Sequence, residues 1–284
     1  MFAPVILFFI MFKYVPMYGA IIAFKKYNFA DGILHSPWVG WDNFKLLFST
    51  PTTIQIIRNT LVLSLLSIIV GFPFPIMLAI MLNEVRKMWF KKAVQTLVYL
   101  PHFFSWIIVS GMVVTVFSQQ SGIVSELWES LTGHSYPFLY REGSWLAIFV
   151  GSGIWKEAGF SAIIYLAALT NIDPTLYEAA SIDGASKWKQ IRHVTLPGLQ
   201  MTIVLMLILS MGRVMEVGFD QIYMLQNSTV SDVSEVISTY IYKIGLMGSQ
   251  FSLTAALGLF ESLVGFILVL ATNAIARRFG NGLW

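Results

Sequence analysis

Six long apolar stretches, separated by shorter polar segments, set the pattern of hydrophobic and polar positions along this chain. An α-helix needs about 20 consecutive apolar residues to cross the hydrocarbon core of a bilayer, so each stretch predicts one membrane-spanning helix. The predicted spans cover residues 4–24, 56–82, 94–117, 145–169, 199–217 and 253–276. We therefore predict an all-α polytopic membrane protein that forms a single transmembrane domain over residues 1–284.

Composition agrees with a location in the membrane. The chain is 56% hydrophobic and only 12% charged, whereas a soluble domain carries about 25% charged residues. It has no cysteine, which excludes disulfides and thiolate metal sites, and its four histidines lack the spacing of metal ligands. The net charge of +3 lies mainly in short loops, so we expect no nucleic-acid partner. No basic segment precedes the first apolar stretch, and we expect no cleavable signal peptide.

The distribution of basic residues predicts the orientation of the chain, because cytoplasmic loops carry an excess of lysine and arginine. Nine basic residues lie in the second loop, in the fourth loop and after the last span: Arg86, Lys87, Lys91, Lys92, Lys187, Lys189, Arg192, Arg277 and Arg278. Six lie on the other side: Lys25, Lys26, Lys45, Arg58, Arg141 and Lys243. We therefore expect the second loop, the fourth loop and both termini in the cytoplasm.

Four prolines interrupt the apolar stretches, namely Pro16, Pro73, Pro75 and Pro101. Each removes a backbone donor and tends to kink a helix. In a bilayer the freed carbonyl groups need partners from neighbouring helices or from a water-filled cavity. The prolines therefore indicate either a pathway through the protein or an irregularity of helix packing.

A polar segment between the fourth and fifth predicted spans carries a specific motif, EAASIDGASKWKQIRHVTLP, over residues 178–197. It resembles the EAA signature of permease subunits of binding-protein-dependent ABC importers. The residues that carry this resemblance are Glu178, Ala179, Ala180, Gly184, Val194, Leu196 and Pro197. The family usually has isoleucine where Val194 stands. Residues 14–19, 171–174 and 218–221 look like the carbohydrate-importer branch, and more narrowly like permeases for complex or acidic oligosaccharides.

The resemblance implies that a cytoplasmic coupling loop, residues 171–198, places two short helices between spans four and five, one of which binds a groove on an ATP-binding subunit. The expected coupling residues are Glu178, Ala179, Ala180, Asp183, Gly184, Lys187, Trp188, Leu196 and Pro197. Negative charge at Glu178 would be favoured near a helix N-terminus. Gly184 would end the first short helix or remove a side chain from the contact, and Pro197 would set the start of the fifth span. The alternative is an ordinary solvated loop helix.

The same resemblance implies the partners. We expect a second permease subunit in a heterodimer, two ATP-binding subunits that carry ATP and Mg²⁺, an extracytoplasmic solute-binding protein and an oligosaccharide substrate, in a bacterial cytoplasmic membrane. The chain itself has no G-x-x-x-x-G-K-[ST] loop, so we expect it to bind no cofactor. Substrate would cross by alternating access, driven by closure of the ATPase pair.

Ionisable residues within the spans are candidates for function, because each costs about 2.5–3.5 kcal/mol to insert. They are Lys13, Lys156, Glu157, Arg213, Glu216 and Glu261. Lys156 and Glu157 are adjacent, so they should point about 100° apart on a helix and cannot simply neutralise each other. At least one of them needs a partner elsewhere or a water-filled cavity. Arg213, Glu216 and Asp220 should share one face of the fifth span. Either Arg213 pairs with Glu216, or this face lines the translocation path.

Sugars are bound by aromatic faces together with hydrogen-bonding groups, and cations suit the carboxylates of uronates. The expected path residues are therefore Trp155, Lys156, Tyr165, Arg213, Glu216 and Gln221. The expected substrate is an oligosaccharide, preferably an acidic one derived from alginate or pectin. Small residues on the spans should instead serve helix packing: Gly151, Gly153, Gly159, Gly258 and Gly265.

Two other functions compete with the importer. An ion-coupled secondary transporter would use Glu157, Glu216 or Glu261 as proton carriers, but it leaves the fourth loop unexplained. An intramembrane enzyme has little support, because the sequence contains neither H-E-x-x-H nor G-x-S-x-G.

Overall fold

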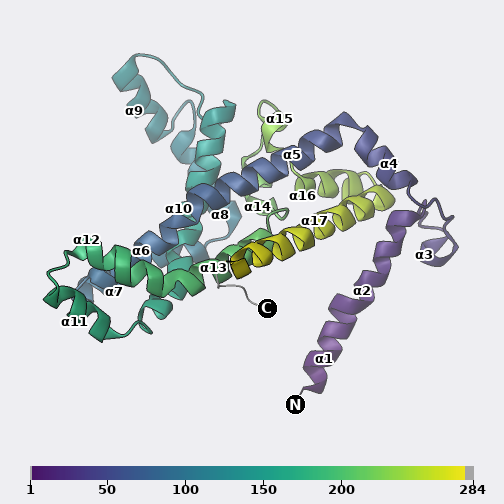
Figure 1. Ribbon diagram of the computed structural model, residues 1–284. Helices are drawn as coiled ribbons and strands as arrows, with labels where there is room; N and C mark the ends of the chain where they lie inside the picture. Colours follow the sequence, from purple (N-terminus) through teal and green to yellow (C-terminus); the bar gives the residue numbers. More distant parts are fainter. Residues whose placement is uncertain (1, 279–284) are drawn as a thin grey trace.

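The computed structural model describes residues 2–278, and this part of the chain is built from helices (Figure 1). Five helices are long and apolar enough to cross a membrane, and a sixth candidate consists of two helices joined at a sharp bend. The five continuous helices are Ala3–Phe24, Pro51–Glu84, Glu142–Leu169, Lys187–Gly212 and Phe251–Arg278. The prediction of an all-α polytopic membrane protein is confirmed.

Several of the five long helices are divided into α-helical parts by short 3₁₀ or π-helical segments. The α-helical parts are α1 (Ala3–Phe9), α2 (Val15–Met17), α5 (Pro51–Leu66), α6 (Pro73–Glu84), α10 (Glu142–Leu169), α12 (Lys187–Gln190), α13 (Leu196–Gly212) and α17 (Phe251–Arg278). Shorter helices fill the connections: α3 (Gly32–His35), α4 (Asp42–Ser49), α9 (Ile123–Thr132), α11 (Pro174–Ile182), α14 (Phe219–Leu225), α15 (Ser231–Ser234) and α16 (Ile237–Tyr240). A 3₁₀ segment, Tyr18–Phe24, ends the first long helix.

The third predicted span, residues 94–117, is not one helix. It consists of α7 (Met88–Tyr99), a 3₁₀ turn (Leu100–Phe103) and α8 (Trp106–Phe117), and the chain bends by 102° between the two halves. Pro101 removes a backbone donor from the turn, and Ser105 caps the new helix by accepting a hydrogen bond from the Ile108 N–H. Hydropathy does not reveal this bend, because the residues on both sides of it are apolar.

Other prolines, Pro75 among them, lie in long helices that continue past them. Three of these prolines follow a π-helical turn by two residues: Pro16 after Ile10–Tyr14, Pro73 after Ser67–Gly71, and Pro197 after Ile191–Thr195. A proline ring clashes with the carbonyl four residues before it, and a local π turn re-satisfies the freed backbone groups. The kink expected at Pro73 is therefore absorbed within one continuous helix, Pro51–Glu84.

The fifth predicted span, residues 199–217, is displaced toward the N-terminus. The helix starts at Lys187 and ends at Gly212, and residues 213–218 are not helical. Arg213, Glu216 and Asp220 therefore do not share a helical face, and that expectation is wrong. The end of α13 lies close to α17, since a Cβ on Gly265 would come within 3.1 Å of the Gly212 carbonyl oxygen. Gly265 thus serves close helix packing, as expected.

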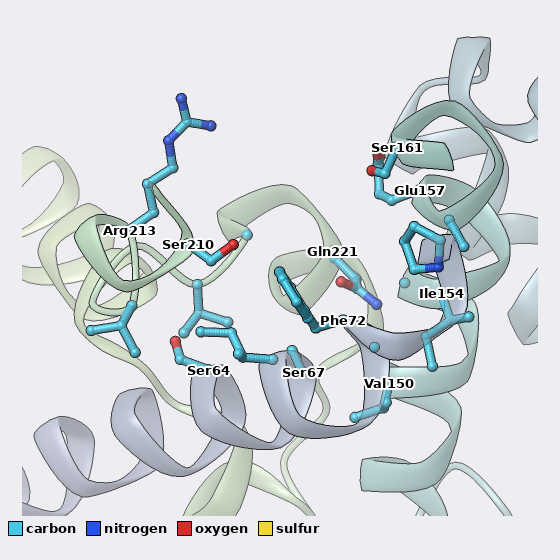
Figure 2. Close-up of a pocket in the computed structure, with 18 of the residues that line it drawn as sticks. Ser64, Ser67, Phe72, Val150, Ile154, Glu157, Ser161, Ser210, Arg213 and Gln221 are labelled. Carbon is cyan, nitrogen blue, oxygen red and sulfur yellow. The ribbon is translucent and has the colours of Figure 1, made fainter. Parts of the chain in front are cut away.

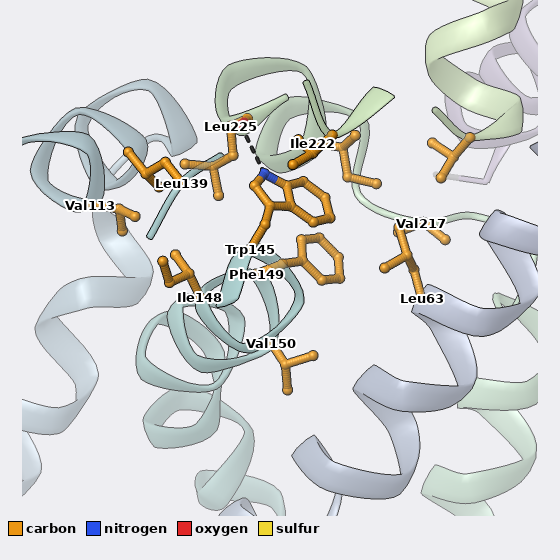
Figure 3. Packing of buried hydrophobic residues seen from close by; sticks show 12 residues of the cluster. Leu63, Val113, Leu139, Trp145, Ile148, Phe149, Val150, Val217, Ile222 and Leu225 are labelled. Atoms are coloured by element: carbon orange, nitrogen blue, oxygen red, sulfur yellow. Dashed lines mark hydrogen bonds between the residues drawn. The ribbon is translucent and has the colours of Figure 1, made fainter. Parts of the chain in front are cut away.

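A buried cluster around Trp145 fastens the segment after this break to α10 (Figure 3). Trp145 is 1% exposed, and its Nε1–H donates to the Leu225 carbonyl at 2.9 Å. Its ring stacks on Phe149 with centroids 5.5 Å apart. Because Leu225 ends α14, this bond holds α14 against the first turns of α10.

Gly159 allows α10 to lie directly on α7, because a Cβ at this position would be 1.9 Å from the Val98 carbonyl oxygen. We predict that Gly159→Ala destabilises the protein by about 3 kcal/mol, since a backbone atom has no rotamer through which to move away. Fluorescence-detected gel filtration of the heated, detergent-solubilised protein measures this effect. Gly151→Ala on the same helix is the matched control, because its Cβ would meet nothing within 4 Å. Equal melting of the two variants would contradict the prediction.

The loops predicted on the cytoplasmic side gather at one end of the molecule. Figure 1 shows α11 and α12 beside the ends of α6 and α7, far from α3, α4 and α15. An ion pair crosses between these loops, because Lys187 Nζ lies 3.1 Å from Glu84 Oε2. The second and fourth loops therefore share one side.

Candidate functional site

A cavity of about 380 Å³ lies between the second span, α10 and the break after α13 (Figure 2). Its volume falls in the range of small-molecule sites, about 300–1,000 Å³. The position of the cavity follows from the backbone. A helix that ends within a membrane leaves polar groups without partners, and such irregular backbone is tolerated where it lines a cavity.

The cavity combines polar groups with aromatic rings. Its polar lining comprises Ser64, Ser67, Glu157, Ser161, Ser210, Arg213, Glu216 and Gln221. Its aromatic lining comprises Phe72, Trp106, Phe149 and Tyr165. Hydroxyl and amide groups exchange hydrogen bonds with the hydroxyls of a polar guest, and ring faces cover its apolar side. The lining therefore suits a guest that is both hydroxylated and partly apolar.

Arg213 is the cation of this lining. It follows the last residue of α13, and within residues 2–278 it forms no ion pair. The alternative of a pair with Glu216 is therefore not seen. Figure 2 shows its guanidinium on the open side of the cavity, across from Glu157. Five N–H donors on a fixed plane are thus available to an anionic guest.

Lys156 and Glu157 both find the expected partner elsewhere, at His102, but they also pair with each other, which was not expected. Lys156 Nζ lies 3.3 Å from Glu157 Oε1 and donates to the His102 carbonyl at 2.7 Å. Glu157 Oε2 lies 2.8 Å from His102 Nδ1. The angle of 100° separates the Cα–Cβ directions of the two residues. The lysine side chain is long and flexible enough to bring its ammonium group to the neighbouring carboxylate. Lys156 is 5% exposed and does not line this cavity, unlike most of the other expected path residues.

The other expected path residues divide between two places. Tyr165, Glu216 and Gln221 line the cavity. Trp155 does not, and instead borders a separate apolar cavity of about 440 Å³ between α8 and α10. Gln221 Nε2 donates to the Phe149 carbonyl at 2.7 Å and to Ser152 Oγ at 3.1 Å, so this amide mainly ties α14 to α10.

Sequence reasoning missed most of the cavity lining. The four serines, Phe72, Trp106 and the neighbouring His102 were not expected there. Serine is only weakly polar, so it leaves little mark in a hydropathy profile. The one available signal was the spacing of Ser64 and Ser67, which places both hydroxyls on one face of the second span.

A second candidate site is the polar segment before α12. Asp173 caps α11 by accepting a hydrogen bond from the Thr175 N–H at 2.9 Å, and Pro174 is the first helical residue. The backbone and side-chain hydrogen bonds of Thr175 hold the pKa of Asp173 below its usual value. Glu178 lies in the middle of α11, so its expected place near a helix N-terminus is wrong. The pair Asp173-Pro174 is the sequence signal that marks the actual start of α11.

Gly184 ends α11 with a left-handed conformation, φ +75°. The Gly184 N–H bonds to the Ser181 carbonyl at 3.1 Å, and the Ala185 N–H bonds to the Ala180 carbonyl at 2.9 Å. Only glycine adopts this conformation at little cost. Within residues 2–278, a Cβ at Gly184 would meet nothing within 4 Å beyond its chain neighbours, so the outer side of the turn is open.

Side-chain contacts bind this turn to the helix that follows it. The Tyr177 hydroxyl lies 3.0 Å from Thr195 Oγ1, and Gln190 Nε2 donates to Ser181 Oγ at 2.9 Å. Because α12 continues through a π turn into α13, Pro197 does not set the start of the span, and that expectation is wrong. Leu196 and Pro197 lie in the first turn of α13. Glu178, Ala179, Asp183, Lys187 and Trp188 are exposed, and Ala180 is half-buried.

Comparison with known proteins identifies the chain. Residues 71–281 match the family described as "Binding-protein-dependent transport system inner membrane component". The chain belongs to this family. One relative is the "Polygalacturonan/rhamnogalacturonan transport system permease protein YteP" of Bacillus subtilis (strain 168), 46% identical over 99% of this chain and 88% of the relative. "Protein LplB" of the same strain is 42% identical over 97% and 87%.

Solved structures support the same family. The permease shares a TM-score of 0.90 and 43% identity with a chain of a bacterial ABC transporter involved in the import of the acidic polysaccharide alginate, covering 97% of this chain and 93% of that one. A second structure of a bacterial alginate ABC transporter, in complex with an alginate pentasaccharide-bound periplasmic protein, has the same TM-score and 42% identity. The resemblance seen in the sequence is thereby confirmed. The protein is a membrane transport subunit rather than an enzyme, and the ion-coupled carrier is set aside.

Proposed function

We propose that this permease is one half of a heterodimer that imports acidic oligosaccharides, derived from pectin or alginate, through the bacterial cytoplasmic membrane. The observation that carries the proposal is Arg213, a cation with no carboxylate partner in the described chain, at the wall of a hydroxyl-lined cavity. The relatives add support, because YteP is named for polygalacturonan and rhamnogalacturonan and the similar transporter for alginate. All three polymers contain uronic acids.

The chemistry of the cavity matches a uronate sugar. A guanidinium holds a carboxylate through two parallel N–H···O bonds, which a neutral sugar cannot offer. The hydroxyls of Ser64, Ser67, Ser161 and Ser210 suit the sugar hydroxyls, and Tyr165 and Trp106 supply ring faces. The path is assembled where α13 ends, so movement of α13 changes the position of Arg213 directly.

The turn between α11 and α12 is the proposed contact with an ATP-binding subunit. Two large apolar side chains stand out from this polar segment, with Ile182 87% exposed and Trp188 70% exposed. Apolar anchors within a polar rim are typical of protein interfaces. Ile182 was not among the coupling residues expected from the sequence. Since α12 runs into α13 without interruption, force applied at this turn reaches the cavity along one helix.

The remaining partners complete the proposed transporter. A second permease would close the side of the cavity on which Arg213 stands, and two ATP-binding subunits would carry ATP and Mg²⁺. An extracytoplasmic solute-binding protein would deliver the sugar, and both termini of this chain would lie in the cytoplasm. Closure of the ATPase pair would then expose the path alternately to the two sides.

Uptake by the complete transporter in proteoliposomes tests the proposal. Unsaturated galacturonate, rhamnogalacturonate and alginate oligosaccharides are compared with neutral arabino- and maltooligosaccharides, each with the solute-binding protein present. We expect uptake that needs internal ATP, resists proton uncouplers and favours at least one uronate. Uptake restricted to neutral sugars would overturn the acidic class, and uptake without ATP would overturn the importer.

A further inference from the structure

We propose that Lys156 is the internal counter-ion of the cavity, which neutralises Glu157 so that this carboxylate does not repel an acidic sugar. The inference rests on the proposed function, in which acidic oligosaccharides pass this cavity. It assigns Lys156 a positioning and charge-balancing role behind the wall instead of a contact with substrate.

The surroundings of Lys156 place its charge within the protein. Its Nζ donates to the His102 carbonyl at 2.7 Å, lies 3.3 Å from Glu157 Oε1, and stands 5.5 Å from the centroid of the Trp106 ring. The side chain is only 7% exposed. An ammonium group has three donors, and these contacts supply a carbonyl, a carboxylate and a ring face. Lys156 is therefore satisfied without a guest in the cavity.

Glu157 faces the cavity, but both of its oxygens are engaged from behind. Its side chain is 45% exposed, and it lines the cavity across from Arg213 in Figure 2. Oε1 meets Lys156, and Oε2 lies 2.8 Å from His102 Nδ1. A carboxylate only accepts hydrogen bonds, so Nδ1 carries the proton in this contact. An approaching anion therefore meets a carboxylate whose negative charge is already paired with Lys156.

The same contacts join α10 to the bend in the third span. The His102 ring stacks on Phe160 with centroids 3.9 Å apart and planes 3° apart. Lys156, Glu157 and Phe160 all belong to α10, whereas His102 lies in the turn that contains Pro101. A clamp of this kind is the purely structural explanation of the cluster. The experiment must therefore separate the clamp from the charge.

The balance of charge in the cavity distinguishes the two explanations. The charged groups of the lining, within the described residues, are Glu157, Glu216 and Arg213. With Lys156 behind Glu157, the positive charges of Arg213 and Lys156 balance the negative charges of Glu157 and Glu216. Removal of the lysine charge leaves one net negative charge facing an anionic cargo. Charges interact strongly in a weakly screened interior, so we expect a loss of about tenfold in uptake of an acidic sugar.

The test measures uptake by the complete transporter in proteoliposomes. The substrate is an unsaturated digalacturonate or an alginate trisaccharide, and the solute-binding protein is saturating. The variants are Lys156→Met, Glu157→Gln, and the double variant Lys156→Met with Glu157→Gln, which restores the charge but leaves the clamp broken. We expect about tenfold slower uptake for Lys156→Met and recovery to within about threefold of wild type for the double variant. Lys156→Met with Glu129→Gln is the matched control, because Glu129 is an exposed carboxylate on α9, away from the cavity. It should stay slow.

Specific outcomes overturn the inference. If the double variant is as slow as Lys156→Met, the lysine acts as a clamp and not as a counter-ion. If the Lys156→Met permease does not assemble, the Glu157→Gln variant tests the inference instead. A loss of tenfold or more in its uptake rate would show that the carboxylate itself is required, and would overturn the inference. Failure of the proposed function looks different, because the wild-type transporter would then import no uronate at all.

Discussion

Replacing Gly184 with valine is expected to lower ATP-driven uptake by at least about 30-fold. The residue stands at φ +75°, where a side chain with a Cβ is strained by about 1–2 kcal/mol and a β-branched one by more. The new side chain would also project from the open face of the turn, where a Cβ meets nothing within 4 Å among the described residues other than its chain neighbours. If that face meets an ATP-binding subunit, the variant should insert into the membrane but no longer co-purify with the ATPase.

Gly133→Val is the matched control for this experiment. Gly133 ends α9 with nearly the same conformation, φ +74°, and its Cβ would likewise meet nothing within 4 Å. It therefore imposes the same backbone strain at a site far from the proposed contact. We expect the control to keep its ATP-binding subunits. Equal co-purification of both variants with the ATPase would contradict the proposed role of the turn.

Reversing the charge of Glu178 provides a second probe of the same surface. Glu178 is exposed on α11 and, within the described part of the chain, has no ion-pair partner. Glu178→Lys should therefore leave the permease folded and weaken ATPase binding, whereas Glu178→Gln should weaken it less.

Replacing Arg213 with glutamine is expected to lower uptake of a uronate oligosaccharide by about 30-fold. A hydrogen bond to a charged group contributes about 1.5–3 kcal/mol, and 2 kcal/mol corresponds to about 30-fold. Arg213→Lys should be intermediate, because lysine keeps the charge but lacks the planar fork. Initial uptake rates at saturating solute-binding protein measure the effect.

Arg58→Gln is the control for lost positive charge. Arg58 is an exposed arginine of α5 that does not line the cavity and has no ion pair within residues 2–278. This variant should transport at a rate close to that of wild type. If Arg213→Gln did so too, the cavity would not be the path of an acidic cargo, and the proposed substrate class would lose its main support.

The turn between α11 and α12 could be predicted in its backbone, while its contact with an ATP-binding subunit stays a prediction. Its signature residues are close in sequence, and the turn conformation at Gly184 depends on local backbone sterics alone. The lining of the cavity was predicted only in part, and the substrate path itself stays a prediction. Arg213, Glu216, Tyr165 and Gln221 line the cavity, but Trp155 and Lys156 do not. Charge and aromaticity identify candidates within a span without saying which way each side chain faces.

The class of the protein, the outline of its membrane spans and the polar turn between the fourth and fifth spans follow from local sequence patterns. Lipid offers no hydrogen bonds to the backbone, so a long apolar stretch forms a helix, in which the backbone groups bond to one another. Family membership followed from the same local information, since the signature spans only residues 178–197.

The places where helices bend or end, and the pairs of charged groups that meet, depend on packing between distant segments. The 102° bend at the third span and the end of α13 at Gly212 are held by contacts with other helices. The contact between Lys156 and His102 joins residues 54 positions apart. Such pairs depend on how helices pack together, and a hydropathy pattern, which reports each segment against lipid, contains no information about that packing.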